Sequence, residues 1–190
     1  MIAQGGTKLR KGLPTLIEDG DNALPPLGRE VMRELDGQLV ALDEQLSRTE
    51  PLVRRVFTQS AASQKLAQGE GIGPVIATAL VAAVGNAKKF INGRHLAAWL
   101  GLVPRQCSSG GKERLVGIRK RGDRYLRTLV IHGARATVPR ARRKTDARSR
   151  WIVSLEQRRG KKLATVAIAN KNARSAWALL PSDAEYRKAA

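Results

Sequence analysis

From Leu27 onward, apolar residues recur every three or four positions among charged ones, which places them on one face of an α-helix. These positions are Leu27, Val31, Leu35, Leu39, Leu42 and Leu46. The pattern predicts an amphipathic, coiled-coil-like helical segment over residues 27–65, with Pro51 breaking or restarting the helix. The spacing from Leu35 to Leu46 is close to a coiled-coil seam, so this face packs either in an oligomer or against the same chain.

Residues 1–26 contain many Gly, Pro, Asp and Asn residues, as in "GLPTLIEDGDNALPP". These residue types favour turns over regular structure. We therefore expect an irregular lead-in before the long helix.

Residues 71–73 read Gly-Ile-Gly between two stretches of helical pattern. The stretch "SAASQKLAQ" precedes them, and an apolar helix is predicted from Pro74 to Val84, begun by proline and ended by Gly85. This order is typical of a helix-hairpin-helix DNA-binding element. Gly71 and Gly73 let backbone N–H groups of the turn face a phosphate at the positive end of the second helix. Many helical hairpins turn on glycine, so a purely structural turn is the alternative.

The second half of the chain predicts several short elements. These are a helix capped at Asn92, a hairpin strand at Leu115–Ile118, a helix from Asp123, a basic connector over residues 140–162 and a terminal helix over 163–180. Asn170, Lys171 and Asn172 interrupt the apolar pattern of the terminal helix, either as polar anchors or as surface. The predicted fold is mainly α, with a long N-terminal helix, a helix-hairpin-helix, a short β-hairpin or loop and two C-terminal helices. Residues 66–180 form the main domain and 181–190 a tail.

The net charge of +19 is concentrated in one part of the chain. Between Lys88 and Lys162 there are 22 Lys or Arg against four Asp or Glu, whereas the remainder is nearly neutral. A charge excess confined to one segment is typical of a surface that binds a polyanion. DNA or RNA is the expected partner, and a membrane is not, because no strongly apolar helix face accompanies the charge.

Composition places the chain in a reducing compartment, because its one cysteine, Cys107, cannot form an internal disulfide. No apolar run reaches the roughly 20 residues needed to span a bilayer, and the N-terminus lacks a signal-peptide core. We therefore expect a cytoplasmic protein. His95 and His132 have no second ligand at metal spacing, so we assign no metal to them.

The segment "CSSGGKER", residues 107–114, is a candidate phosphate-handling loop. Its glycines let the backbone approach a bound group closely, although a simple turn is the alternative. A serine hydroxyl needs a base or a metal to become a nucleophile, and no carboxylate or histidine next to it in sequence supplies one. Cations that could stabilise the transition-state charge on a phosphate are Lys112, Arg114, Lys120, Arg121 and Arg124.

The segments "GIGPVIATALVAAVGNAKKFINGRHLAAWLGLVPRQCSSGGKERLVGIRKRGDRYLRTLVIHGARATV" and "ATVAIANKNARSAWALL" carry a resemblance to a known family. They resemble the C-terminal transposase domain of the DEDD-type insertion-sequence transposases, the "one-ten" family and its "eleven-eleven" branch. The resemblance runs from about residue 66 to residue 180. Residues 27–65 are similar to the helical coiled-coil segment that precedes this domain.

The resemblance implies a DNA recombinase guided by a structured RNA, in a bacterial cytoplasm and associated with the nucleoid. It implies a composite active site, in which a RuvC-like domain supplies four metal-binding acids and this domain supplies a serine that attacks a DNA phosphodiester. That serine maps to Ser109, with Ser108 as the alternative. The residues expected to bind nucleic acid are Gly71, Gly73, Lys112, Arg114, Lys120, Arg121, Arg124 and Arg127.

The 190 residues show no RuvC-like pattern, so we expect a truncated transposase part that is inactive alone. No cofactor is expected in this chain, and Mg²⁺ only with the RuvC-like domain. A homo-oligomer is expected through the N-terminal helix. A non-enzymatic helix-hairpin-helix module that binds DNA or RNA is the alternative function.

Overall fold

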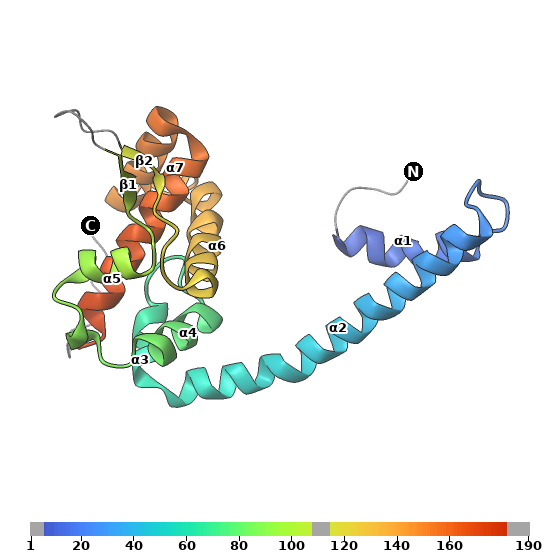
Figure 1. Ribbon diagram of the computed structural model, residues 1–190, viewed down its shortest axis with the longest axis horizontal. Helices are drawn as coiled ribbons and strands as arrows, with labels where there is room; N and C mark the ends of the chain where they lie inside the picture. The colour runs from blue at the N-terminus through green and yellow to red at the C-terminus, as the bar shows by residue number, and fades with distance from the viewer. Residues whose placement is uncertain (1–5, 108–114, 182–190) are drawn as a thin grey trace. The chain divides into compact units, whose positions relative to one another are not determined.

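The computed structural model of the protein describes residues 6–107 and 115–181. In that part of the chain it has seven α-helices, one short 3-10 helix and one two-stranded hairpin (Figure 1). The predicted mainly α-helical fold is therefore confirmed. The chain divides into two compact units, Met1–Leu52 and Val53–Ala190. The domain boundaries predicted at residues 26, 65 and 180 stay predictions.

The first unit contains helix α1, Gly6–Glu18, and most of helix α2, Pro26–Gln59. The expectation of an irregular lead-in is wrong for α1. Leu13 and Ile17 lie one helical turn apart and are both buried, so this segment has an apolar face despite its glycines and proline. The Arg10 guanidinium links the two helices, because it donates to the Leu39 carbonyl oxygen at 2.6 Å and pairs with the Asp43 carboxylate.

Helix α2 continues through Pro51, where the sequence predicts a break. Proline removes one backbone hydrogen bond from a helix, but the turns on either side keep theirs, so the helix does not end there. Five residues of the predicted seam are exposed: Leu27, Val31, Leu35, Leu42 and Leu46. The seam is therefore an apolar face on the surface of the first unit.

In the second unit, helices α3, Ala61–Ala67, and α4, Pro74–Val84, flank the Gly-Ile-Gly turn. The predicted bounds of α4 are confirmed, with proline at its first position and Gly85 after its last. Gly85 has a φ of 55°, a left-handed conformation that favours glycine at a helix end. Leu66, Ala77 and Leu80 bury the two helices in the core.

A 3-10 helix, η1 over Ala87–Lys89, leads into helix α5, Gly93–Trp99. The predicted cap of α5 is confirmed, since the Asn92 side chain accepts from the backbone N–H of His95 at 2.9 Å. Strands β1, Pro104–Gln106, and β2, Leu115–Ile118, then pair antiparallel. The predicted hairpin strand is confirmed as β2.

Helix α6, Arg124–Ala141, begins where the sequence predicts, and Asp123 caps it, since its carboxylate accepts from the Leu126 N–H at 2.9 Å. Helix α7 runs over Ala147–Leu179, so most of the segment predicted as a basic connector is helical and belongs to the same helix as the predicted terminal helix. Ile152 is fully buried there, and its packing outweighs the charged neighbours that suggested a connector. Gly160 kinks α7, with φ 78° and ψ 161°, into a first half before it and a second half after it.

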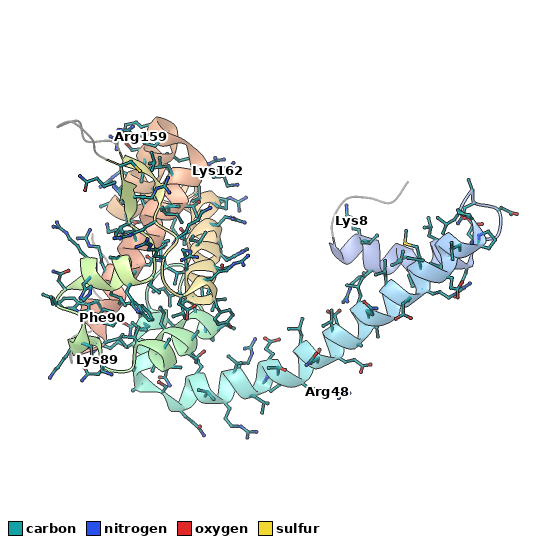
Figure 2. All side chains as sticks on the ribbon, in the orientation of Figure 1. Lys8, Arg48, Lys89, Phe90, Arg159 and Lys162 are labelled. Carbon is teal, nitrogen blue, oxygen red and sulfur yellow. The ribbon has the colours of Figure 1, made fainter. Side chains whose placement is uncertain are left out.

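The core of the second unit is built from Leu, Ile, Val and Ala of α3 to α7. Small residues on the second half of α7 allow close approach of its neighbours: Ala164, Ala169, Ala173 and Ala176 are fully buried. No helix in the described part of the chain is both long and apolar enough to cross a membrane. Outside the core the surface is basic, as Lys89, Arg159 and Lys162 illustrate in Figure 2.

Candidate nucleic-acid interface

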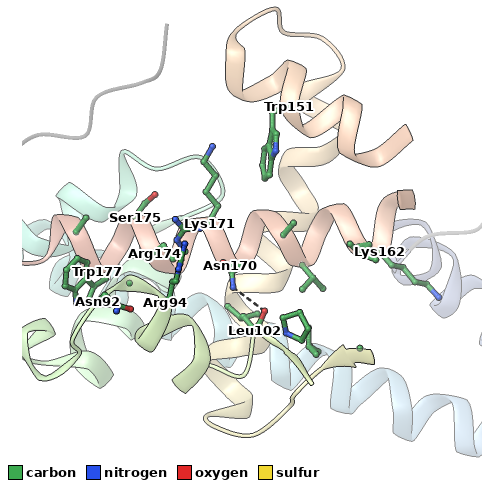
Figure 3. A pocket seen from close by; sticks show the side chains of 18 of the residues that line it. Asn92, Arg94, Leu102, Trp151, Lys162, Asn170, Lys171, Arg174, Ser175 and Trp177 are labelled. Atoms are coloured by element: carbon green, nitrogen blue, oxygen red, sulfur yellow. Dashed lines mark hydrogen bonds between the residues drawn. The ribbon is translucent and has the colours of Figure 1, made fainter. Parts of the chain in front are cut away.

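A groove of about 1400 Å³ lies along the second half of α7. Strand β2 and the segment from Leu102 to Pro104 form one side, and the start of α5 contributes Asn92 and Arg94. Trp151 projects into the groove from the first half of α7 (Figure 3). The kink at Gly160 thus brings the two halves of one helix to the same groove.

Positive charge dominates the polar lining of this groove. Its basic residues are Arg94, Lys162, Lys171 and Arg174, and its described lining contains no Asp or Glu. Apolar side chains, among them Leu102, Ile118 and Val166, supply much of the remaining surface. An apolar groove with cations and no carboxylates has the chemistry to hold an anion with an apolar body.

Lys171 and Trp151 meet across the groove. The Lys171 ammonium lies 4.6 Å from the centroid of the Trp151 ring, within the range of a cation–π contact. Partial burial lowers the pKa of Lys171, and the positive charges of Arg148 and Arg174 lower it further. The Lys171 ammonium is thus repelled by the charges of Arg148 and Arg174, and a bound anion would reduce this repulsion.

Two hydrogen bonds fix the second half of α7 to the elements opposite. Asn170 Nδ2 donates to the Leu102 carbonyl oxygen at 3.4 Å (Figure 3), and Trp177 Nε1 donates to the Phe90 carbonyl oxygen at 2.9 Å. The partners of these bonds are 68 and 87 residues apart in the sequence. The second half of α7 is therefore fixed to these segments by hydrogen bonds as well as by the core.

The loop between β2 and α6 presents a second group of cations. Lys120 and Arg121 are exposed on it, and Arg124 is exposed at the first position of α6; all three are predicted nucleic-acid contacts. Two glycines hold this loop against the end of α5. A Cβ on Gly122 would lie 1.8 Å from the Trp99 carbonyl oxygen, and one on Gly101 would lie 2.3 Å from the Arg121 carbonyl oxygen. The backbone under these cations is thus fixed by close contact.

Arg127 differs from the other predicted contacts, because its side chain is buried, with 8% exposed. Its Nη1 donates to the Leu100 carbonyl oxygen at 3.4 Å. That contact gives Arg127 a part in joining α6 to the end of α5. Its role in binding nucleic acid stays a prediction.

The Gly-Ile-Gly turn places its two glycines in different surroundings. Gly71 has a φ of 82° and faces α6, where a Cβ would lie 2.8 Å from the Gly133 carbonyl oxygen. Gly73 caps α4, and a Cβ there would meet nothing within 4 Å. Gly71 therefore serves packing, whereas Gly73 leaves the positive end of α4 open.

A polar network holds the turn in place from the other side. The Glu70 carboxylate pairs with the Lys144 ammonium and lies 3.5 Å from Arg148 Nε. Asn172 Nδ2 donates to the Glu70 carbonyl oxygen at 3.0 Å, and its Oδ1 accepts from Arg148 Nη2 at 2.6 Å. Asn172 is thus a polar anchor, while its neighbour Lys171 faces the groove.

Ser108, Ser109, Lys112 and Arg114 lie outside the described residues. They belong to the segment between β1 and β2, and β2 supplies Val116, Gly117 and Ile118 to the groove. The predicted serine is therefore joined in sequence to a wall of the groove. Among the described residues, no three His, Cys, Asp or Glu side chains come together as metal ligands.

Sequence reasoning missed Trp151, Lys162, Lys171 and Arg174 as site residues. No local sequence pattern marks any of them as a site residue, because the groove is formed by elements that are distant in the sequence and adjacent in the fold. The interruption of the apolar pattern at Asn170–Asn172 was the available signal. It marks the turn of α7 where groove and polar network meet.

The chain is similar to several transposases of insertion sequences. It is 50% identical over 176 residues to a protein of Pseudomonas aeruginosa described as a probable family 20 transposase, covering 92% of this chain and 52% of that protein. It is 40% identical over 186 residues to the transposase for insertion sequence element IS1111A of Coxiella burnetii, covering 98% and 51%. It is also 32% identical over 183 residues to the transposase for element IS1328 of Yersinia enterocolitica, covering 96% and 54%.

The chain spans about half the length of these relatives. Residues 63–150, from within α3 to the first residues of α7, match the family described as "Transposase IS116/IS110/IS902 family". The resemblance seen in the sequence motifs is confirmed. The chain therefore carries a transposase domain of the IS116/IS110/IS902 family.

Proposed function

We propose that the chain binds DNA as the serine-carrying part of an insertion-sequence transposase and acts in DNA transposition and recombination. One observation carries this proposal: the segment 88–162 has 22 basic residues against four acidic ones. Within this segment, Lys120 and Arg121 lie on a loop held by Gly101 and Gly122, and Arg94 and Lys162 line a groove whose described lining has no carboxylate. Such a surface gains free energy from a polyanion through counterion release. The family supports DNA as that polyanion.

The basic residues and the serine have separate roles in this proposal. Lys120, Arg121 and Arg124 contact phosphates and so position the DNA without reading its sequence. The Ser109 hydroxyl, or that of Ser108, attacks a phosphodiester. An Oγ–P bond forms while the P–O bond to the leaving strand breaks, the hydroxyl proton passes to a base, and the leaving oxygen takes up a proton.

Further partners follow from the family resemblance. They are a RuvC-like domain, a guide RNA and a second copy of the chain. By the same resemblance, Mg²⁺ would be held by the RuvC-like domain. The exposed apolar seam of α2 is the surface that we assign to the second copy, because burial of such a seam stabilises helix pairs.

The alternative function is a non-enzymatic helix-hairpin-helix module that binds DNA or RNA. The open position of Gly73 favours it, because backbone N–H groups at the start of α4 are accessible to a phosphate. Both functions predict nucleic-acid binding. They differ in whether the serine hydroxyl is needed.

A salt titration of DNA binding tests the proposal. We expect micromolar or weaker, sequence-tolerant binding to duplex DNA whose logarithmic affinity falls linearly with the logarithm of salt concentration. Gly73→Leu is expected to weaken this binding, whereas Gly37→Leu, at an equally open glycine of α2, is not. A flat salt dependence contradicts the electrostatic basis. Full affinity in folded Gly73→Leu assigns the turn a structural role.

A further inference from the structure

Trp151 offers an aromatic face inside a cationic groove. It is the one tryptophan on the first half of α7, half-buried, and it points toward the second half across the groove (Figure 3). Part of its side chain packs against the hydrophobic core, and the Lys171 ammonium lies 4.6 Å from the centroid of its ring. An ammonium is a mobile group on a flexible stem, so a flat ligand can take its place on the ring.

The charges around the ring favour an anionic ligand. Lys171 and Arg174 lie one turn apart on α7, Arg94 faces them from α5, and no carboxylate is among the described residues of the groove. Burial and the charges of Arg148 and Arg174 lower the pKa of Lys171, which shows that its charge is held at a cost. A phosphate between Lys171 and Arg174 would offset that cost.

The size and lining of the groove favour nucleotides. Its volume of about 1400 Å³ exceeds the roughly 300–1000 Å³ of sites that hold one drug-sized molecule. Leu102, Ile118 and Val166 provide apolar contact for the faces of bases. In a duplex the base faces are already stacked on one another, so only unpaired bases can use an aromatic face of this kind.

We propose that this groove binds a short unpaired stretch of DNA, with one base stacked on Trp151 and the adjoining phosphates on Lys171 and Arg174. Arg94 and Lys162 lie at the rim, where they contact the next phosphates. The proposal rests on the DNA-binding function above. DNA is the occupant because the chain carries a transposase domain, and a DNA strand that leaves one duplex to join another is transiently unpaired.

The test compares three probes: labelled single-stranded poly-dT, a duplex of the same length and single-stranded poly-rU. Fluorescence anisotropy with the 190-residue chain gives the affinity for each. Trp151→Ala is expected to weaken poly-dT binding about fivefold or more and to weaken duplex binding much less. Trp151→Phe, which keeps a ring, is expected to retain most of the poly-dT affinity.

Matched controls separate the groove from general effects. Trp99→Ala removes a half-exposed tryptophan that does not line the groove, and it is expected to leave the preference for poly-dT intact. Lys171→Ala is expected to weaken poly-dT binding more than Lys11→Ala, which removes the same charge from α1 of the first unit. Circular dichroism and thermal melting show whether each variant is folded.

The outcomes distinguish this inference from the proposed function. If the unmodified chain binds no DNA at any salt concentration, the proposed function fails and the groove proposal with it. If it binds DNA with the expected salt dependence but Trp151→Ala and Lys171→Ala match their controls, only the groove proposal fails. It also fails if poly-rU binds more tightly than poly-dT, or if Trp151→Ala weakens duplex binding as much as poly-dT binding. Should Trp151→Ala not fold, Trp151→Phe and Lys171→Ala decide by the same comparisons.

Discussion

Gly71 and Gly133 allow the turn before α4 to touch α6. A Cβ on Gly133 would lie 2.0 Å from the Gly71 carbonyl oxygen and 2.6 Å from Ile76 Cδ1. Because one of these partners is backbone, the clash cannot be relieved by a side-chain rotation. We expect Gly133→Ala to destabilise the protein by about 1–3 kcal/mol, the usual cost of overpacking, and to lower its melting temperature.

Gly73→Ala is the matched control for this substitution. It lies in the same turn, has a φ of −82° and would place its Cβ in open space. We expect its thermal melt to overlay that of the unmodified chain. Equal melting temperatures for Gly133→Ala and Gly73→Ala would show that the turn does not pack closely on α6.

At the scale of elements, the start of α7 depends on Asp146. Its carboxylate accepts from the Ser149 backbone N–H at 3.0 Å and from the Ser149 hydroxyl at 2.7 Å. These hydrogen bonds lower the pKa of Asp146 below its ordinary value of 3.8. A lowered pKa means that the ionised carboxylate stabilises the fold at neutral pH, and that this contribution is lost as pH falls through 3.8 and below.

We therefore expect Asp146→Asn to lower the melting temperature at neutral pH and to have a smaller effect as the solution becomes acidic. Asp21→Asn removes the same charge from a loop of the first unit and serves as the control. Thermal melts over a pH series measure the difference for both variants. A difference for Asp146→Asn that stays constant into the acid range would contradict the assigned cap.

Local signals sufficed to predict the elements that begin and end at strong caps. Asn92 and Asp123 mark helix starts by accepting a backbone hydrogen bond, and Pro74 marks one because its φ is fixed and it has no N–H, so the sequence located α4, α5 and α6. Helix α1 and the first half of α7 were missed because Gly, Pro or Arg masks their apolar faces. Those faces become decisive only when they pack, and packing is not a local property.

For the candidate site too, the sequence was enough to find some residues and not others. Lys120, Arg121 and Arg124 follow one another closely in sequence, so a charge count finds them. Trp151 and Lys171 are 20 positions apart and meet only because Gly160 kinks α7. A φ of 78° with a ψ of 161° is accessible almost only to glycine, but the sequence offers many glycines and no means to select this one.

At the scale of the whole chain, the two units differ in net charge. The first, Met1–Leu52, has six basic and nine acidic residues, whereas the second has 29 basic and seven acidic residues. The first unit is therefore not suited to bind a polyanion, and its exposed feature is the apolar seam of α2. This separation supports assignment of nucleic-acid binding to the second unit and of self-association to the first.

The proposed serine chemistry also belongs to the scale of the whole protein. Lys120, Arg121 and Arg124 can neutralise a phosphate, but the hydroxyl of Ser109 needs an activating group, and unassisted attack on a phosphodiester is extremely slow. We expect the 190-residue chain, incubated with labelled DNA and Mg²⁺, to form no denaturant-resistant adduct. A chimera that joins it to a RuvC-like domain is expected to form one. Ser109→Ala in the chimera is expected to abolish the adduct, and Ser108→Ala, the matched control, to retain it.

Any other result of the adduct experiment would contradict a particular part of this prediction. An adduct formed by the 190-residue chain and lost on Ser109→Ala would show that this chain activates its own serine. An adduct that survives Ser109→Ala but not Ser108→Ala would move the nucleophile by one residue. If the chimera binds DNA and forms no adduct, or keeps the adduct in both variants, the serine is not the nucleophile. The chain then acts as a binding module, since the basic loop and the groove need no hydroxyl to hold DNA.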